Sequence, residues 1–230
     1  MLTLVSQALK FVRLHGYSEL ISRLLRAAVG PFYQRQSRYI VHLDFDEAAE
    51  PDPGFNFAEL TKNDSEKMLR VMYVSPKSLA KRFDDGDRCF GIIENDELIS
   101  YFWAEFKHKE LHELRLEFEL PGRQAWMYNA ITVGKARGRA CYPNVIRFMA
   151  QSLRQSGFRE AYVDVDPANI PSVKGLEKAG YTRVVMIDMK KIFSKVTYSV
   201  QVYDETVWKQ LSKCICNSDN IATFFGDAAE

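Results

Sequence analysis

A short basic turn in the middle of the chain has the residue types of an anion-binding loop. It reads Arg137-Gly138-Arg139-Ala140 and follows an apolar run that ends at Thr132-Val133. Small residues let the backbone approach a ligand closely, and consecutive N–H groups before a helix form a concave site with partial positive charge. The two guanidinium groups add donors whose geometry suits phosphate. The sequence therefore predicts that this turn can hold a phosphate group.

A helix must follow the turn for such a site, and the next residues predict one. Pro143 suits the first turn of a helix, where its missing N–H costs nothing, and Gly157 provides an end. Four apolar residues between them recur at helical spacing: Val145, Ile146, Met149 and Leu153. A second strand then leads to Asp166-Pro167-Ala168-Asn169, and residues 175–181 close the region. On these residues alone, a plain surface turn explains the basic segment equally well.

Residues 126–185 resemble the acyl-CoA-binding core of the GCN5-related N-acetyltransferase (GNAT) superfamily. Its pyrophosphate loop reads Arg/Gln-x-x-Gly-x-Gly/Ala, and an Asn follows on a later segment before a closing Gly-Phe. The chain is most similar to a branch that reads Arg-Gly-x-Gly-x-Tyr-Pro, Asn-x-x-Ser and Glu-Lys-x-Gly-Phe. These patterns fall on residues 137–143, 169–172 and 177–181. When the loop pattern is aligned from Arg137, Ala140 and Tyr142 stand at two positions that are usually glycine in the superfamily.

The resemblance implies an α/β (α+β) acyl-CoA N-acyltransferase fold. Its central sheet is expected to be mixed, mostly antiparallel, with about six or seven strands flanked by helices and with an N-terminal helical extension. Residues 1–50 lie outside the resemblance and are expected to form amphipathic helices plus a strand over 38–45. The GNAT-like domain is expected over residues 51–210, and a C-terminal tail over 211–230.

The function that the resemblance implies is acetyl-CoA-dependent N-acetylation. An acetyl group would pass directly to a primary amine of a small-molecule or sugar substrate, without a covalent enzyme intermediate. The strand before the turn would hold the pantetheine arm and the turn the pyrophosphate. Eleven residues are the candidates for binding acetyl-CoA: Ile131, Thr132, Val133, Arg137, Gly138, Arg139, Ala140, Cys141, Tyr142, Asn169 and Ser172.

The catalytic acid of the superfamily is missing from its usual place. Many members carry a Tyr four residues before the closing Gly as the acid for the thiolate, and this position is Leu176 here. Tyr128 and Asp164 are the candidate catalytic replacements, because strand alternation aims them at the cleft; a structural hydrogen bond is the competing interpretation. The departure leaves a second hypothesis for the whole chain, a catalytically degenerate acyl-CoA-binding or scaffolding module.

Composition and cysteine spacing argue against several other functional classes of protein. Lys plus Arg (31) almost cancels Asp plus Glu (30), so the net charge of +1 does not indicate a nucleic-acid partner. The four cysteines form no CxxC pair, which predicts reduced thiols in a cytoplasmic protein. No metal site is expected. His108 and His112 are predicted on a solvated turn, and Cys214 and Cys216 are too closely spaced for a zinc knuckle and are predicted to be structural.

The N-terminal residues 2–29 carry a helical apolar period and an excess of basic residues. They predict either an arm that contacts a membrane surface or a partner, or a helical pair that packs on its own domain or across a homodimer. The chain has no uninterrupted apolar run of about 18 residues, so no membrane-spanning helix is expected.

Overall fold

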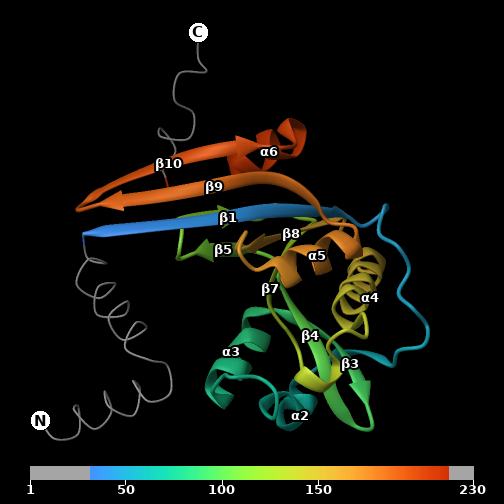
Figure 1. Cartoon of the computed structure of the whole chain (residues 1–230). Helices are drawn as coiled ribbons and strands as arrows, with labels where there is room; N and C mark the ends of the chain where they lie inside the picture. The colour runs from blue at the N-terminus through green and yellow to red at the C-terminus, as the bar shows by residue number, and fades with distance from the viewer. Residues whose placement is uncertain (1–31, 218–230) are drawn as a thin grey trace, which may run out of the picture.

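An eight-stranded sheet organises residues 32–217, the part of the chain that the computed structural model describes (Figure 1). Its strand order is β10-β9-β1-β8-β7-β4-β3-β2, and the β7–β8 pair is the one parallel pair within these residues. The hairpin β5–β6 forms a separate small sheet. The strands are β1 (Tyr33–Asp44), β2 (Phe57–Leu60), β3 (Arg88–Glu94), β4 (Glu97–Glu105), β5 (His108–Leu111), β6 (Leu116–Glu119), β7 (Gln124–Thr132), β8 (Glu160–Val165), β9 (Thr182–Ile192) and β10 (Lys195–Val202).

Helices cover both faces of the sheet. The α-helices are α2 (Ser65–Leu69), α3 (Pro76–Asp85), α4 (Cys141–Gln155), α5 (Ile170–Ala179) and α6 (Glu205–Leu211), and the 3-10 helices are η1 (Lys62–Asp64), η2 (Gly134–Ala136) and η3 (Ser212–Cys214). Helices α4 and α5 bury their apolar sides on one face, where Met149 packs with strand residues such as Met127 and Val163. The other face carries α2, α3, α6 and the β5–β6 hairpin. None of the helices within residues 32–217 is long and apolar enough to cross a membrane.

The predicted helix after the basic turn is confirmed. It is α4, and all four residues of its predicted stripe are fully buried. Its end also agrees, since Gly157 follows two residues after the helix with φ +89°, a conformation that glycine adopts without strain.

The two parallel strands separate halfway along their length. Strands β7 and β8 pair from Gln124–Glu160 to Met127–Val163, and beyond this point β7 stays with β4 while β8 stays with β1. Asn129, with φ +52°, lies opposite a shift in the β4–β7 register, which marks a bulge in β7. Residues 128–132 therefore have no strand partner on the β8 side, and a ligand can take that place.

Two predictions about domain organisation need correction. The strand predicted over 38–45 as part of an N-terminal extension lies inside the sheet as β1, between β9 and β8. The boundary at 50/51 therefore cuts through the domain. At the other end, Leu211 and Ile215 are buried in the core, so the fold extends beyond residue 210. The sheet is mixed and mostly antiparallel as predicted, with eight strands against the predicted number of about six or seven. The helices predicted over residues 2–29 lie outside the described residues.

Glu160 ties the three central strands together where β7 and β8 are still paired. Its carboxylate accepts hydrogen bonds from His42 on β1 and Gln124 on β7, both at 2.7 Å, and from Tyr162 at 3.1 Å. The bond from His42 is the main reason that the pKa of the Glu160 carboxyl lies below its ordinary value, although burial opposes the shift.

Glu160→Gln is expected to lower the free energy of unfolding at pH 7 by about 1.5–3 kcal/mol, the range for hydrogen bonds to a charged group. Because the folded-state pKa is depressed, the carboxylate stabilises the fold above its unfolded pKa of about 4.3 and loses this effect as pH falls through the folded pKa. Urea unfolding at pH 7 and at pH 3 measures the difference, which should shrink at pH 3. An equal difference at both pH values would show that the charge is not responsible.

Candidate functional site

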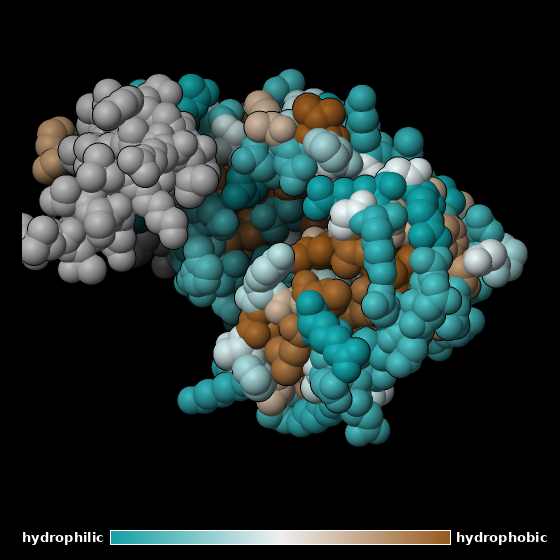
Figure 2. Space-filling model, turned by 60° about the horizontal axis from the view of Figure 1, so that its bottom comes forward, coloured by the Kyte–Doolittle hydropathy of each residue, from teal (hydrophilic) through white to brown (hydrophobic). Residues whose placement is uncertain are grey.

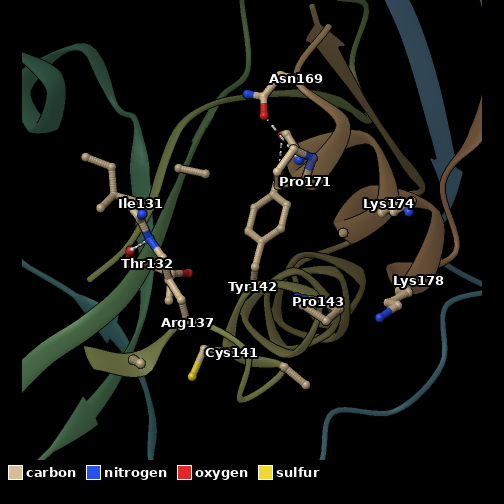
Figure 3. A pocket seen from close by; sticks show the side chains of 16 residues that line it. Ile131, Thr132, Arg137, Cys141, Tyr142, Pro143, Asn169, Pro171, Lys174 and Lys178 are labelled. Atoms are coloured by element: carbon tan, nitrogen blue, oxygen red, sulfur yellow. Dashed lines mark hydrogen bonds between the residues drawn. The ribbon is translucent and has the colours of Figure 1, made fainter. Parts of the chain in front are cut away.

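A cavity of about 710 Å³ opens where β7 and β8 separate (Figure 3). Its walls come from the end of β7, the turn at residues 136–140, the first turn of α4 and one side of α5. The view from the underside of the molecule shows apolar side chains in a hollow between polar rims (Figure 2). The residues that line the cavity are Ala130, Ile131, Thr132, Ala136, Arg137, Gly138, Ala140, Cys141, Tyr142, Pro143, Asn169, Pro171, Ser172, Lys174, Gly175 and Lys178.

The charge of this lining has one sign. Among the described residues that line the cavity, Arg137, Lys174 and Lys178 are cations and none is acidic. The Arg137 Nε donates to the backbone oxygen of Thr132 at 3.3 Å, which holds the guanidinium at the mouth of the cavity. Lys174 and Lys178 lie one turn apart on α5, and neither has an ion-pair partner among residues 32–217. A cluster of unneutralised cations favours a ligand with several negative charges.

The backbone at the start of α4 adds donors to these cations. Gly138 and Ala140 both adopt left-handed conformations, with φ +79° and +58°. No side chain caps the helix, and within the described residues the N–H groups of 138–140 have no hydrogen-bond partner. The first N–H groups of a helix are also without an intrahelical partner. The left-handed form costs an alanine on the order of 1 kcal/mol, so Ala140 keeps the backbone form of a glycine at the cost of strain.

Tyr142 forms part of the cavity floor between α4 and α5 (Figure 3). Its ring packs on Phe102 of β4 at 5.8 Å, and its hydroxyl lies 3.4 Å from the Ser172 Oγ. A Cβ at Gly175 would approach the ring to 2.3 Å, so the ring needs glycine at this position. Burial raises the pKa of Tyr142 to about 12, and the phenol is therefore protonated at neutral pH.

Gly175→Ala is expected to displace the Tyr142 ring and destabilise the fold by about 1–3 kcal/mol, the usual cost of overpacking. The melting temperature of the single variant measures this effect. The control is the same substitution in a Tyr142→Leu background, where the smaller side chain removes the clash and the cost should fall. Equal costs in the two backgrounds would contradict the proposed contact.

The structure brings most of the predicted cofactor-binding residues together. Nine of the eleven line the cavity, and Val133 and Arg139 do not. Val133 donates its N–H to Ile99 and continues the β7–β4 ladder. The Arg139 guanidinium makes two hydrogen bonds to Glu94 on β3, which turn the side chain away from the cavity. Lys174 and Lys178 were not among the predicted residues, although their spacing of four residues is a signal that the sequence contains.

The two predicted catalytic residues flank the same opening on the opposite face of the sheet. Tyr128 and Asp164 each follow the last β7–β8 pair, Met127–Val163. Met127 and Val163 pack toward α4, so alternation along the strands turns Tyr128 and Asp164 to the other side. Leu176 is buried in the core and does not line the cavity.

Tyr128 is fixed by an acid and two cations. Its hydroxyl donates to Asp87 Oδ2 at 2.5 Å, and Arg82 and Lys109 lie 5.2 and 5.0 Å from its ring centroid. Burial first, then the hydrogen bond and charge of Asp87, raise the pKa of Tyr128 far above its ordinary value. Burial also raises the pKa of Asp87, although the Tyr128 hydroxyl opposes this shift. Tyr128 is thus a neutral phenol that is hydrogen-bonded to a carboxylate.

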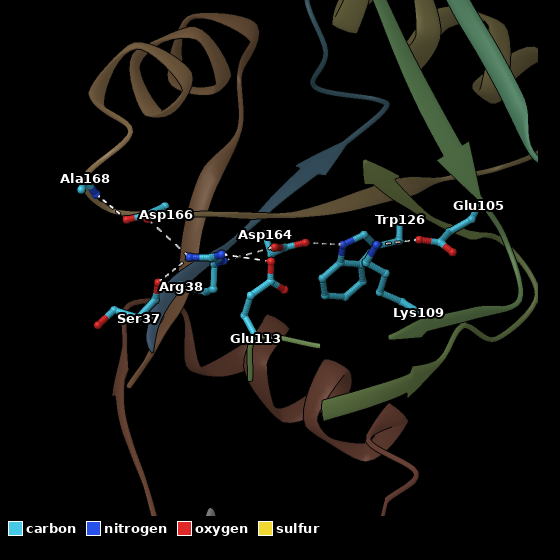
Figure 4. A network of polar contacts seen from close by, with 9 residues as sticks. All are labelled: Ser37, Arg38, Glu105, Lys109, Glu113, Trp126, Asp164, Asp166 and Ala168. Atoms are coloured by element: carbon cyan, nitrogen blue, oxygen red, sulfur yellow. Dashed lines mark hydrogen bonds and ion pairs between the residues drawn. The ribbon is translucent and has the colours of Figure 1, made fainter. Parts of the chain in front are cut away.

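Asp164 lies in a wider polar network (Figure 4). It accepts a hydrogen bond of 3.2 Å from the Trp126 Nε1 and lies 3.6 Å from the Arg38 Nε. Arg38 also contacts Glu113 and Asp166. Together with Tyr128, this face carries five carboxylates, Asp87, Glu105, Glu113, Asp164 and Asp166, and three cations, Arg38, Arg82 and Lys109. The acceptor face, as we call these residues, is therefore acidic, in contrast to the basic cavity.

Comparisons of the whole chain rest on structure alone, since no family model and no curated protein matches its sequence. An acetyltransferase described as GNAT family from Colwellia psychrerythraea superposes with a TM-score of 0.52 and 12% identity, over 70% of this chain and 57% of the other. A GCN5-related glucosamine N-acetyltransferase region of a fungal multi-domain β-N-acetylglucosaminidase superposes with a TM-score of 0.50 and 14% identity, over 74% of this chain and 22% of the other. A Drosophila protein superposes with a TM-score of 0.50 and 14% identity, over 79% of this chain and 59% of the other.

The chain thus spans less than two thirds of each of these three proteins. The superpositions cover 70–79% of this chain and so include most of the mostly antiparallel sheet and its flanking helices. The chain has the fold of the GCN5-related N-acetyltransferases.

Proposed function

We propose that the protein is an acetyl-CoA-dependent N-acetyltransferase. The observation that carries this proposal is the cavity at the strand separation, where residues 32–217 provide three cations, no acid and a run of N–H groups without partners among them. The N–H groups of residues 138–142 and Arg137 would hold the pyrophosphate. The unpaired edge of β7 would pair with the amides of the pantetheine arm, because this edge has lost its partner strand.

The acceptor face supports an amine as the second substrate. A net excess of two carboxylates attracts an ammonium group and holds it beside the strand opening. Tyr128 and Asp87 form a relay for its proton. The ammonium passes a proton to the Tyr128 oxygen while the phenol passes its own proton to Asp87, and the resulting neutral amine then attacks the thioester carbon. The new C–N bond forms as the C–S bond breaks, the thiolate leaves with the electron pair, and the nitrogen loses its second proton to water to give the neutral amide.

Tyr142 is the group that we assign to protonate this thiolate, because Leu176 offers no proton and the Tyr142 phenol lies in the cavity. Tyr142→Phe is expected to lower kcat by about tenfold, a modest effect because water can also protonate a thiolate with pKa near 8.5. The dissociation constant of acetyl-CoA should stay within about twofold of the wild type. Steady-state kinetics and calorimetry measure the two quantities. An unchanged kcat would remove Tyr142 from the mechanism.

An amino sugar is the acceptor class that we propose first. The polar, hydrogen-bonding acceptor face suits a hydroxylated amine, and one protein with this fold is described as a glucosamine N-acetyltransferase region. The test is release of free CoA thiol from acetyl-CoA with glucosamine, a linear diamine and an amino acid, with glucose as the control that lacks an amine. Release with an amine and none with glucose is expected. Saturable acetyl-CoA binding without release for any amine would instead support the degenerate binding module.

A further inference from the structure

A second cluster of reactive side chains lies on the β5–β6 hairpin, away from the strand opening. In this hairpin His108 pairs with Glu119, and Glu110 pairs with Glu117. Phe118 and Leu116 alternate with these residues and are fully buried, so the four polar residues share the outer face. His108 therefore lies on a strand, and the prediction of a solvated turn for it is wrong. This outer face combines an imidazole with several carboxylates.

The chain adds a thiol to this face from a distant segment. Residues 215–217 run beside β6. Phe118 forms a β-bridge with Ile215, and the Cys216 N–H donates to the backbone oxygen of Glu117 at 3.0 Å. The Asn217 side chain donates to the Arg115 oxygen at 2.7 Å and accepts from the Glu117 N–H at 3.3 Å. The backbone thus holds Cys216 beside Glu117 without any contribution from the side chains of the cluster.

The three side chains converge on one point. The His108 Nε2 lies 3.8 Å from the Glu117 Oε2, and the ligand atoms of His108, Glu117 and Cys216 all lie within 4.8 Å of one another. Two ligands of a tetrahedral zinc ion, with bonds of about 2.0–2.3 Å, lie roughly 3.3–3.7 Å apart. Small side-chain rotations would therefore bring these atoms to ligand distances.

We propose that His108, Glu117 and Cys216 bind a Zn²⁺ ion. A neutral imidazole, a carboxylate and a thiolate balance the two positive charges of the ion, and this donor set excludes the hard cations Mg²⁺ and Ca²⁺. Water would complete the coordination. The ion would fasten residues 215–217 to the hairpin and stabilise the buried cluster of Trp208, Leu211 and Ile215.

The cysteine pair provides a matched control. Cys214 also lines the hollow, but its Sγ lies 3.7 Å from the Gln210 oxygen and is absent from the converging set. Cys216→Ser should therefore remove a ligand, whereas Cys214→Ser makes the same chemical change two residues away without removing one.

The experiment titrates the full-length protein, stripped with EDTA, with ZnCl₂ against a chromophoric chelator. One equivalent should bind, and excess Mg²⁺ should not compete. Cys216→Ser and His108→Gln should each weaken zinc affinity at least tenfold, while Cys214→Ser keeps wild-type affinity. Zinc should also raise the melting temperature of the wild type but not of Cys216→Ser. Melting in EDTA confirms that each variant is folded. Absence of zinc binding, or equal affinities for the two serine variants, would overturn the proposal.

Discussion

Replacing Lys174 and Lys178 together by glutamate is expected to weaken acetyl-CoA binding by about 100-fold. The substitutions change the charge of the cavity lining from three cations to one cation and two anions. Each reversal near the phosphates costs on the order of 1.4 kcal/mol at the effective dielectric constant of a protein surface, and 1.4 kcal/mol is a tenfold change in affinity. Isothermal titration calorimetry with acetyl-CoA measures the loss, which should shrink at high salt because exposed charges are screened.

The control for this variant is Lys191→Glu with Lys195→Glu. These lysines lie on β9 and β10, the two strands at one edge of the sheet, and do not line the cavity between β7 and β8. The two double variants have the same net charge, so they differ only in where the charge lies. Equal losses of affinity in both would mean that the overall charge matters and that α5 does not face the phosphates.

Asp87→Asn is expected to lower kcat by about 100- to 1000-fold, the range for loss of a general base. The amide keeps an acceptor for the Tyr128 hydroxyl but cannot take its proton. Acetyl-CoA binding should not change, because Asp87 lies on the acceptor face and not in the cavity. The exposed neighbour Asp85, which pairs with Lys81 on α3, provides the control Asp85→Asn, which should retain wild-type kcat.

The pH profile of kcat/KM gives a second test of Asp87 as the general base. Asp87 must be ionised to accept the proton, and burial raises its pKa. Activity should therefore rise with pH through a pKa above the ordinary range of aspartate, and Asp87→Asn should lose this acid limb. A variant that keeps the limb at the wild-type position would show that another group, such as Glu105, is the base.

The resemblance to the GNAT core named nine of the residues that line the cavity, and local patterns predicted the helix that follows the basic turn. The apolar stripe of α4, Pro143 and Gly157 are signals within one helix, and they placed the basic turn correctly. Nine of the predicted residues meet in one cavity because they belong to consecutive elements of one strand–turn–helix unit and the helix after it. The direction of the Lys174 and Lys178 side chains depended on how α5 packs, which no local pattern contains.

The rest of the site, and the place of β1 in the sheet, depended on contacts between segments that are distant in the sequence. Asp87 reaches Tyr128 across 41 residues, and Glu94 takes the Arg139 side chain across 45. Strand β1 inserts between β8 and β9, far along the chain, so an acidic, proline-containing segment after it was mistaken for a domain boundary. Cys216 meets His108 only because residues 215–217 add to the hairpin edge. Such pairings follow from the assembled sheet, and a single sequence does not specify them.

In the proposed function, the turn before α4 holds the phosphates of acetyl-CoA. Amide hydrogen exchange of the full-length protein, with and without saturating acetyl-CoA, measures this contact. With acetyl-CoA bound, we expect slower exchange of the N–H groups at residues 138–142 and no change in the β9–β10 hairpin. Unchanged exchange at residues 138–142 in the presence of saturating acetyl-CoA would contradict it.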